Sequence, residues 1–148
     1  MMTNTNTTFD NFQMNEIRKG FENGLSIEQV SVLANPEFDN FQMAEIRLGF
    51  ESGLSDLVLL YADPKFDNFQ MEQIRLGFEN GLKHKVQLYM DVEFSSFQME
   101  EIRLGFEHGL THAHIAKYAF TDKPCFQMEE IRLQLEAGKD SQKEWGEL

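Results

Sequence analysis

The stretch FDNFQMAEIRLGFESGL, from Phe38 to Leu54, occurs in closely related form five times along the chain. Its Phe-Gln-Met core recurs every 28 or 29 residues, at Phe12, Phe41, Phe69, Phe97 and Phe126. Self-similarity at such a period is typical of arrays in which supersecondary units stack on their neighbours. Residues that every copy shares are explained first by architecture, so functional residues are sought in what the copies do not share.

The first half of each repeat predicts a capped amphipathic helix. In repeat 2, Asp39 is the N-cap and Gln42 completes a capping box, while Phe38 and Met43 form a hydrophobic staple. The same four roles fall to Phe9, Asp10, Gln13 and Met14 in repeat 1, to Phe66, Asp67, Gln70 and Met71 in repeat 3, and to Phe94, Ser95, Gln98 and Met99 in repeat 4. The recurrent Gln and Met are therefore interpreted as cap and core residues.

This helix is apolar on two sides. Met43 and Phe50 share one face at 100° per residue, and Leu48 lies nearly opposite, close to Phe41. The pattern predicts that the helix is sandwiched between neighbours and that the repeated phenylalanine opens the interface between units. Repeat 1 has Lys19 in place of the leucine, which we interpret as a solvent-facing terminal cap.

Two glycines mark the second part of each long helix. Gly49 lies inside the helical pattern, where glycine costs about 1 kcal/mol relative to alanine, so we expect another backbone, that of a companion helix, to approach closely. Gly53 is predicted to end the helix at the C′ position. A shorter second helix should follow, with Ser26, Ser55 and Thr111 as N-caps in repeats 1, 2 and 4.

We therefore predict an all-α fold: a small α-solenoid of four αα-hairpin repeats plus a fifth capping helix. The repeats span residues 9–37, 38–65, 66–93, 94–122 and 123–138 of a single helical repeat domain, 9–138. Residues 1–8 are predicted to be a disordered polar leader, and residues 139–148 a polar C-terminal tail.

Composition limits the function classes. The chain has 25 acidic residues against 13 Lys and Arg, a formal net charge of −12. This argues against direct nucleic-acid or membrane binding, which need a basic surface, and allows a basic protein partner or a merely solubilising surface. A single cysteine, Cys125, the lack of a signal-peptide pattern and the lack of a long apolar run predict a cytoplasmic protein.

Neither a catalytic group nor a metal site is predicted, and the chain is expected to be no enzyme and to need no cofactor. His108, His112 and His114 cluster in repeat 4, but the helix stop at Gly109 should break the i,i+4 geometry that a metal pair needs.

Charged residues also repeat. Each copy has one arginine with a glutamate four residues later, which indicates i,i+4 pairs and ion ladders between repeats; a row of arginines gripping an extended chain is the alternative. Acids in the first turns of the long helices complement the helix dipole. They could equally form an acidic edge that imitates a phosphate backbone and binds a partner: Glu45, Glu72, Glu100, Glu101, Glu129 and Glu130.

The unit FDNFQMEQIRLGFENGL (66–82), joined to its neighbour by YADPKF (61–66), resembles a helical repeat of Firmicute phage and mobile-element proteins, YADPxFdxxQMxEIRLGLexGL. The resemblance covers residues 9–137 and implies a mobile-element context, in which proteins of this size often antagonise host defence. We therefore expect a non-enzymatic protein-binding module that inhibits a bacterial defence protein, such as a CRISPR nuclease or a restriction enzyme, through an acidic, nucleic-acid-mimicking surface. The alternative is a self-associating scaffold, a homo-oligomer without inhibitory role.

Overall fold

The computed structural model describes residues 8–146, and for residues 139–146 the backbone alone. Every regular element in this range is an α-helix or a 3-10 helix, which confirms the predicted all-α class. The chain divides into two compact units, with the boundary between Arg75 and Leu76 inside helix α5 (Asn68–Glu79). The predicted leader, apart from Thr8, lies outside the described residues.

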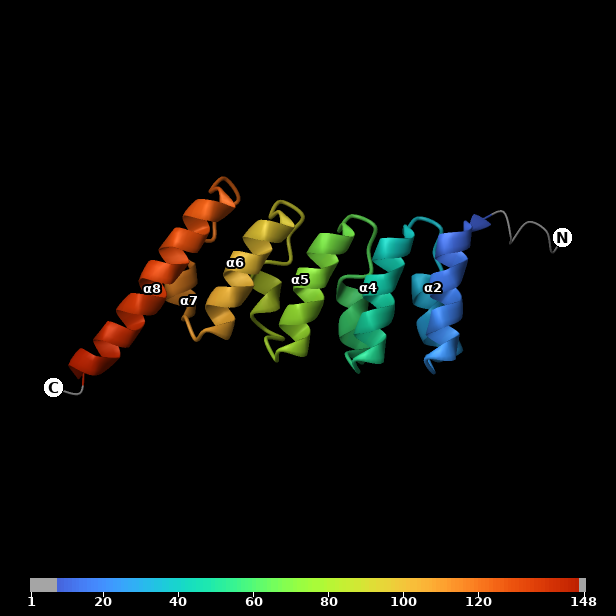
Figure 1. Ribbon diagram of the computed structural model, residues 1–148, viewed down its shortest axis with the longest axis horizontal. Coiled ribbons are helices and arrows are strands. Elements are labelled where there is room, and N and C mark those ends of the chain that lie inside the picture. Colours follow the sequence, from blue (N-terminus) through green and yellow to red (C-terminus); the bar gives the residue numbers. More distant parts are fainter. Residues whose placement is uncertain (1–7, 147–148) are drawn as a thin grey trace. The chain divides into compact units, whose positions relative to one another are not determined.

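Unit 1 holds repeats 1 and 2 and the start of repeat 3. Its helices are α2 (Asn11–Glu22), α3 (Ile27–Leu33), α4 (Asn40–Glu51), the 3-10 helix η1 (Ser55–Leu60) and the first two turns of α5. Helices α2 and α4 pack side by side, and α3 contacts both (Figure 1). The stacking of one repeat on the next within the unit is compatible with the predicted solenoid.

Unit 2 holds the remaining repeats. It comprises the end of α5, the 3-10 helix η2 (Val86–Leu88), α6 (Ser96–Glu107), α7 (His112–Ile115) and α8 (Cys125–Gly146). Helix α6 packs against both α7 and α8. The backbone of α8 stays helical to Gly146, so the fifth helix is longer than the predicted repeat 123–138, whose bounds stay a prediction.

The predicted caps of the long helices are present. In α4, the Asp39 side chain accepts from the Gln42 backbone N–H at 2.7 Å, and the Gln42 side chain accepts from the Asp39 N–H at 2.9 Å. At the other end, Leu54 N–H donates to the carbonyl of Gly49, and Gly53 adopts a φ of 87°, the left-handed conformation that favours glycine. These are the capping box and the C′ glycine that the sequence predicts.

The second halves differ from the prediction in two repeats. Repeats 1 and 4 form α-helices with capping boxes at Ser26 and Thr111, but repeats 2 and 3 form 3-10 helices. Ser55 is not an N-cap: it is the first residue of η1, at a φ of 53°, and makes no cap hydrogen bond. The 3-10 repeats are the ones whose Phe-Gln-Met motifs are followed by the 28-residue spacing. A 3-10 helix rises about 2.0 Å per residue against 1.5 Å, so fewer residues span the same gap.

In repeats 1 to 4, the long helix packs on its companion element at the interior glycine. Met43, Ile46 and Tyr61 are fully buried there. A Cβ on Gly49 would overlap the Tyr61 hydroxyl, and Gly77 and Gly105 stand in the same relation to Tyr89 and Tyr118. The expectation that a second backbone approaches these glycines is therefore wrong, because a tyrosine side chain fills the space.

Candidate functional site

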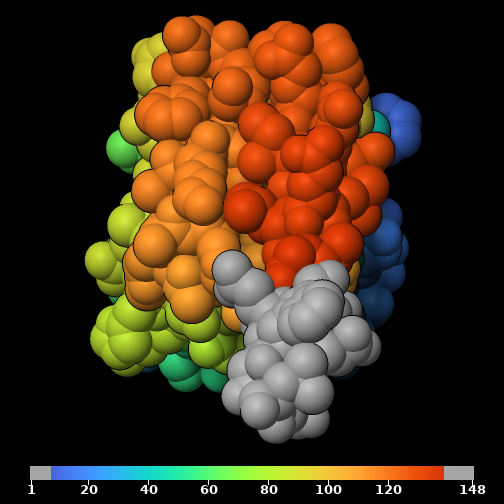
Figure 2. All heavy atoms as spheres, turned by 90° about the vertical axis from the view of Figure 1, so that its left-hand side faces the viewer, coloured from blue at the N-terminus to red at the C-terminus, as the bar shows by residue number. Residues whose placement is uncertain are grey.

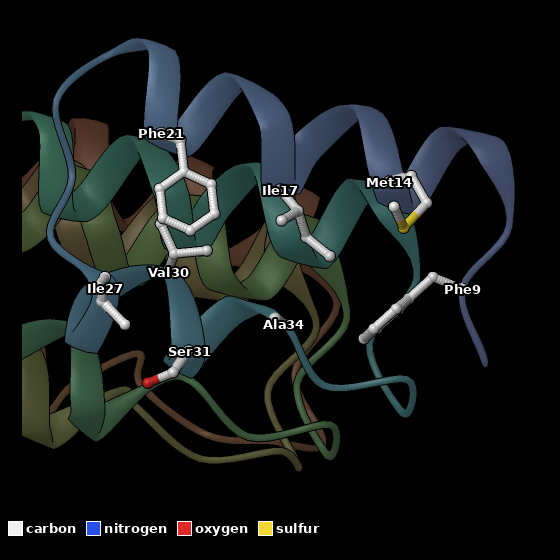
Figure 3. A pocket seen from close by; sticks show the side chains of 8 residues that line it. All are labelled: Phe9, Met14, Ile17, Phe21, Ile27, Val30, Ser31 and Ala34. Atoms are coloured by element: carbon white, nitrogen blue, oxygen red, sulfur yellow. The ribbon is translucent and has the colours of Figure 1, made fainter. Parts of the chain in front are cut away.

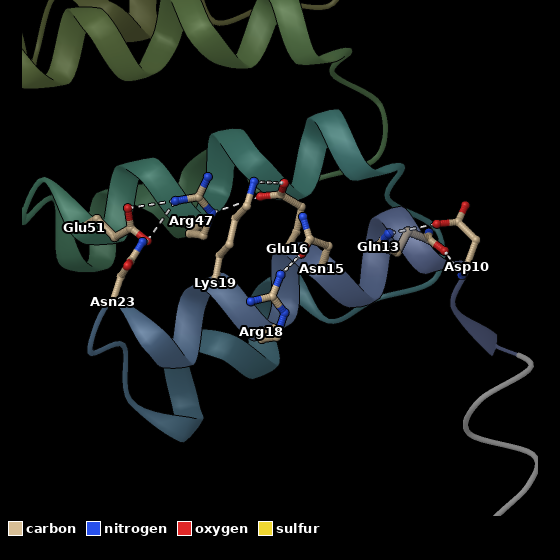
Figure 4. A network of polar contacts seen from close by, with 9 residues as sticks. All are labelled: Asp10, Gln13, Asn15, Glu16, Arg18, Lys19, Asn23, Arg47 and Glu51. Carbon is tan, nitrogen blue, oxygen red and sulfur yellow. Dashed lines mark hydrogen bonds and ion pairs between the residues drawn. The ribbon is translucent and has the colours of Figure 1, made fainter.

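A ladder of polar contacts joins neighbouring repeats, as Figure 4 shows for repeats 1 and 2. Arg47 donates from Nε to Glu16 at 2.9 Å and from Nη1 to Glu51 on its own helix at 2.9 Å. Asn23, which follows α2, donates from Nδ2 to the same Glu51 at 2.9 Å. Arg47 thus links a carboxylate of the preceding repeat to one of its own, as the ladder prediction requires.

The same ladder recurs at other junctions. Arg75 donates from Nε to Glu45 at 2.8 Å in unit 1. In unit 2, Arg132 donates to Glu101 at 2.8 Å and to Glu136 at 2.9 Å, with only 7% of its side chain exposed. The arginine row is therefore occupied by ion pairs, which leaves little of it to grip an extended chain.

Burial and pairing shift the ionisation of this ladder. Burial raises the pKa of the Glu101 carboxyl, and the hydrogen bond from Arg132 only partly offsets it. At Glu136, burial also acts to raise the pKa, but hydrogen bonds from Arg132 and His108 outweigh it, so the pKa is lowered from its ordinary value. The carboxylate of Glu136 is thus stabilised in the folded protein.

The predicted acidic edge is only partly exposed. Glu45 and Glu101 are buried and paired with arginines of the following repeats, so their placement on an exposed partner-binding edge is wrong. Glu72 and Glu100 are half-buried, and Glu129 and Glu130 are exposed. That these four bind a partner stays a prediction. One signal was available in the sequence: the acid at the position of Glu45 recurs at Glu16, Glu101 and Glu130, which marks it as architecture.

The repeated glutamine has a second role that the sequence interpretation missed. Beyond its capping box, Gln42 donates from Nε2 to the carbonyl of Phe66 in the next repeat, at 2.7 Å. Gln98 likewise donates to the carbonyl of Lys123 at 2.8 Å. A glutamate would serve the capping box but has no N–H, so the use of glutamine in every copy was the available signal.

The three histidines of repeat 4 do not converge. His108 Nδ1 lies 2.9 Å from Glu136, in the position where Asn80 reaches Glu107 one repeat earlier. The His112 ring packs edge-on against Phe106, and His114 takes part in the Thr111 capping box. Among the side chains described, residues 8–138, no group of three or more His, Cys, Asp or Glu could hold a metal ion.

The phenylalanine of Phe-Gln-Met points to solvent in every copy. Between 60% and 72% of each is exposed: Phe12, Phe41, Phe69, Phe97 and Phe126. The prediction that this residue opens the interface between units is therefore wrong. Met43 and Ile46, on the apolar side of α4, are buried. Gln42 and Glu45 of the same helix make the contacts to the following repeat.

We define the outer face as the surface of the long helices that carries these phenylalanines, with the residues three and seven positions further on. In unit 2 it holds an aromatic residue, an acid and a leucine on each of two helices: Phe97, Glu100 and Leu104 on α6, and Phe126, Glu129 and Leu133 on α8. In unit 1, α4 has alanine at the middle position and α2 has asparagine, so the acidic character there begins with Glu72 of α5.

A second apolar surface lies at the free side of repeat 1. Met14 is 41% exposed and Phe21 51%, whereas Met43 and Phe50, at the same positions in repeat 2, are buried. They line an apolar hollow of about 350 Å³ between α2 and α3 (Figure 3), together with Phe9, Ile17, Ile27, Val30, Ser31 and Ala34. The interpretation of Lys19 as the solvent-facing cap is wrong, because Lys19 lies on the α4 side of α2, 3.3 Å from Glu16 (Figure 4).

Comparison with protein-family models, with curated proteins and with solved structures finds no match to the chain. The resemblance to the phage and mobile-element repeat therefore stays a prediction. Within residues 8–146, no helix is both long enough and apolar enough to cross a membrane.

Proposed function

We propose that this chain is a non-enzymatic protein-binding repeat module and that the outer face is its contact surface. One observation carries the proposal: all five copies keep a phenylalanine that the core does not use. The position three residues further on is not constant: it is Asn15 and Ala44 in the first two copies and a glutamate in the last three, Glu72, Glu100 and Glu129. Exposed aromatic side chains act as anchors in many protein interfaces, and each of the two units exposes at least two of these phenylalanines.

The partner that fits this face is a basic protein surface with apolar patches. Phe97 and Phe126 alternate with the carboxylates of Glu100 and Glu129, and guanidinium groups both stack on aromatic rings and pair with carboxylates. The nucleic-acid channel of a bacterial defence protein, a CRISPR nuclease or a restriction enzyme, has this character. Inhibition of such a protein is the activity we propose. Its support is the net charge of −12, the acids Glu72, Glu100, Glu129 and Glu130, and the resemblance to the phage repeat.

The test is capture of partners from a bacterial lysate by three purified forms of the chain. The wild type is compared with a Phe97→Ser/Phe126→Ser variant and with the control Phe120→Ser, which removes an exposed phenylalanine outside the outer face. A partner retained by the wild type and the control but lost by the double variant supports the proposal, and inhibition of its DNA cleavage would establish the activity. Equal retention by all three forms contradicts it, and binding that salt does not weaken contradicts the mimicry.

A self-associating scaffold is the second candidate function. The observation that favours it is the exposed apolar side of repeat 1. Met14 and Phe21 are exposed there, whereas the residues at the same positions in repeat 2, Met43 and Phe50, are buried.

A further inference from the structure

The two end repeats expose opposite halves of one junction. At the junction of repeats 1 and 2, the earlier repeat supplies Gln13 and Glu16, and the later one supplies Arg47 and the carbonyl of Phe38. Gln13 donates from Nε2 to that carbonyl at 2.6 Å, and Glu16 accepts from the Arg47 guanidinium. A junction of this kind therefore has a giving side, with the glutamine and the acid, and a receiving side, with the arginine and the carbonyl; repeat 3 alone has a glutamine, Gln73, at the position of the acid.

Repeat 1 exposes a receiving side. Arg18 stands where repeat 2 has Arg47, and 59% of its side chain is exposed, against 11% for Arg47. It contacts Glu22 and Asn15 of its own helix. The apolar residues beside it, Met14 and Phe21, are exposed as well. Repeat 1 therefore carries the same arginine and apolar residues that contact the preceding repeat at an internal junction.

Repeat 5 exposes a giving side. Gln127 and Glu130 on α8 are exposed, whereas the corresponding Gln98 and Glu101 on α6 are buried in the junction with α8. Leu133 is exposed too, while its counterpart Leu104 is half-buried. Figure 2 views this end of the chain, where the atoms of α8 (red) and of the α7 region (orange) lie toward the viewer.

We propose that copies of this chain join head to tail, with α8 of one copy packed on α2 of the next. Glu130 would accept from Arg18 of the next copy, and Gln127 would donate to the carbonyl of Phe9, as Glu16 and Gln13 do toward repeat 2. A second copy is the occupant that fits, because this chain itself carries the acid and the amide that the receiving side lacks. The inference rests on the scaffold as the second candidate function and uses none of the exposed phenylalanines of the outer face.

The contact is weaker than an internal junction. In the described part of repeat 5, up to Gly146, α8 is followed by no second helix that could cover the hollow beside Ile27. Ala137 also stands where Asn23 donates a hydrogen bond to the following repeat. A heterologous contact of this kind leaves a free giving side and a free receiving side unless the copies close into a ring. Association is therefore reversible and rises with concentration.

The experiment is sedimentation velocity of the full chain over a range of concentrations, with charge-reversed variants. Arg18→Glu and Glu130→Arg should each weaken self-association by about tenfold or more, since each sets like charges against each other. Mixing the two variants should restore it, because both junctions in the mixture again join an acid to an arginine. Glu129→Arg, with the same charge change one residue away on α8, is the control and should associate like the wild type or more strongly.

The remaining outcomes distinguish a second copy from other occupants of the receiving side. A wild type that stays monomeric at every concentration overturns both the head-to-tail contact and the scaffold function. If it is monomeric but a variant lacking residues 1–7 associates, the leader covers the receiving side and the inference is overturned. Association that neither variant weakens, or that mixing does not restore, leaves the scaffold function standing and overturns the head-to-tail contact.

Discussion

The Tyr61 hydroxyl donates a hydrogen bond to the backbone carbonyl of Glu45 at 2.8 Å, and it lies where a side chain on Gly49 would be. Tyr118 makes the same bond to the carbonyl of Glu101 beside Gly105. Burial raises the pKa of the Tyr118 hydroxyl, so it remains protonated and able to donate. The glycine, the tyrosine and the carbonyl thus form one packing unit, which fixes the companion element against the long helix.

Gly49→Ala should destabilise the protein by about 1–3 kcal/mol, because overpacking outweighs the gain of about 1 kcal/mol in helix propensity. Urea unfolding followed by circular dichroism measures the change. Gly138→Ala is the matched control: nothing lies within 4 Å of a Cβ there, so it should be neutral or stabilising. Adding Tyr61→Phe to Gly49→Ala should recover part of the loss, and strict additivity of the two would contradict the proposed overlap.

Gln42→Glu should destabilise the protein by about 1–3 kcal/mol, although it keeps the capping-box acceptor. The carboxylate cannot donate to the carbonyl of Phe66, and it would place a buried negative charge against that partially negative oxygen. Gln29→Glu is the control, because Gln29 has the same capping role at Ser26 but is only half-buried, and its side chain serves a cap within its own repeat. Equal effects of the two substitutions on the urea midpoint would show that the bond between repeats contributes nothing.

Much of the fold can be predicted from the sequence because it depends on local patterns. The caps at Asp39 and Gly53 are determined by residues within one helix, and both predictions are confirmed. The type of the second element depends on a different quantity, the one-residue difference between the 28- and 29-residue spacings. This explains why Ser55, which looks like Ser26, is not a cap.

The candidate site was less predictable because the repeat period fixes which residues are equivalent and not which side of a helix faces a neighbour. Phe41 and Met43 are both apolar, yet only Met43 is buried. Glu45 and Glu72 are both acids near a helix start, but only Glu45 has an arginine of the next repeat in reach. The contacts between repeats join residues about 30 positions apart in the sequence, and the periodicity of a single helix does not predict such contacts.

The stability of the protein should respond to pH through Glu136. Its folded-state pKa is lowered from 4.5, so it contributes stability above the unfolded pKa, and this contribution is lost as pH falls through the lower folded value. Glu101 has the opposite sign: its pKa is raised, so stability falls as pH rises from the unfolded value to the folded one.

Urea unfolding at a series of pH values below and above 4.5 measures these slopes for the wild type and for Glu136→Gln. The variant should lose less stability on acidification, since one carboxylate with a lowered pKa has been removed. Glu129→Gln removes an exposed carboxylate from the same helix and controls for the change in net charge. An unchanged acid slope in Glu136→Gln would contradict the stabilising role of its bonds to Arg132 and His108.

Phe97 and Phe106 on α6 allow the structural and the surface roles of phenylalanine to be separated. Phe106 is 3% exposed, so Phe106→Ala should cost about 3–5 kcal/mol. Phe97 is 66% exposed, so Phe97→Ala should change the free energy of unfolding by no more than about 0.5 kcal/mol. Both values come from urea unfolding of the purified variants. A large loss in Phe97→Ala would mean that the phenylalanine serves the fold, and the outer face would then lose the observation that identifies it as a binding surface.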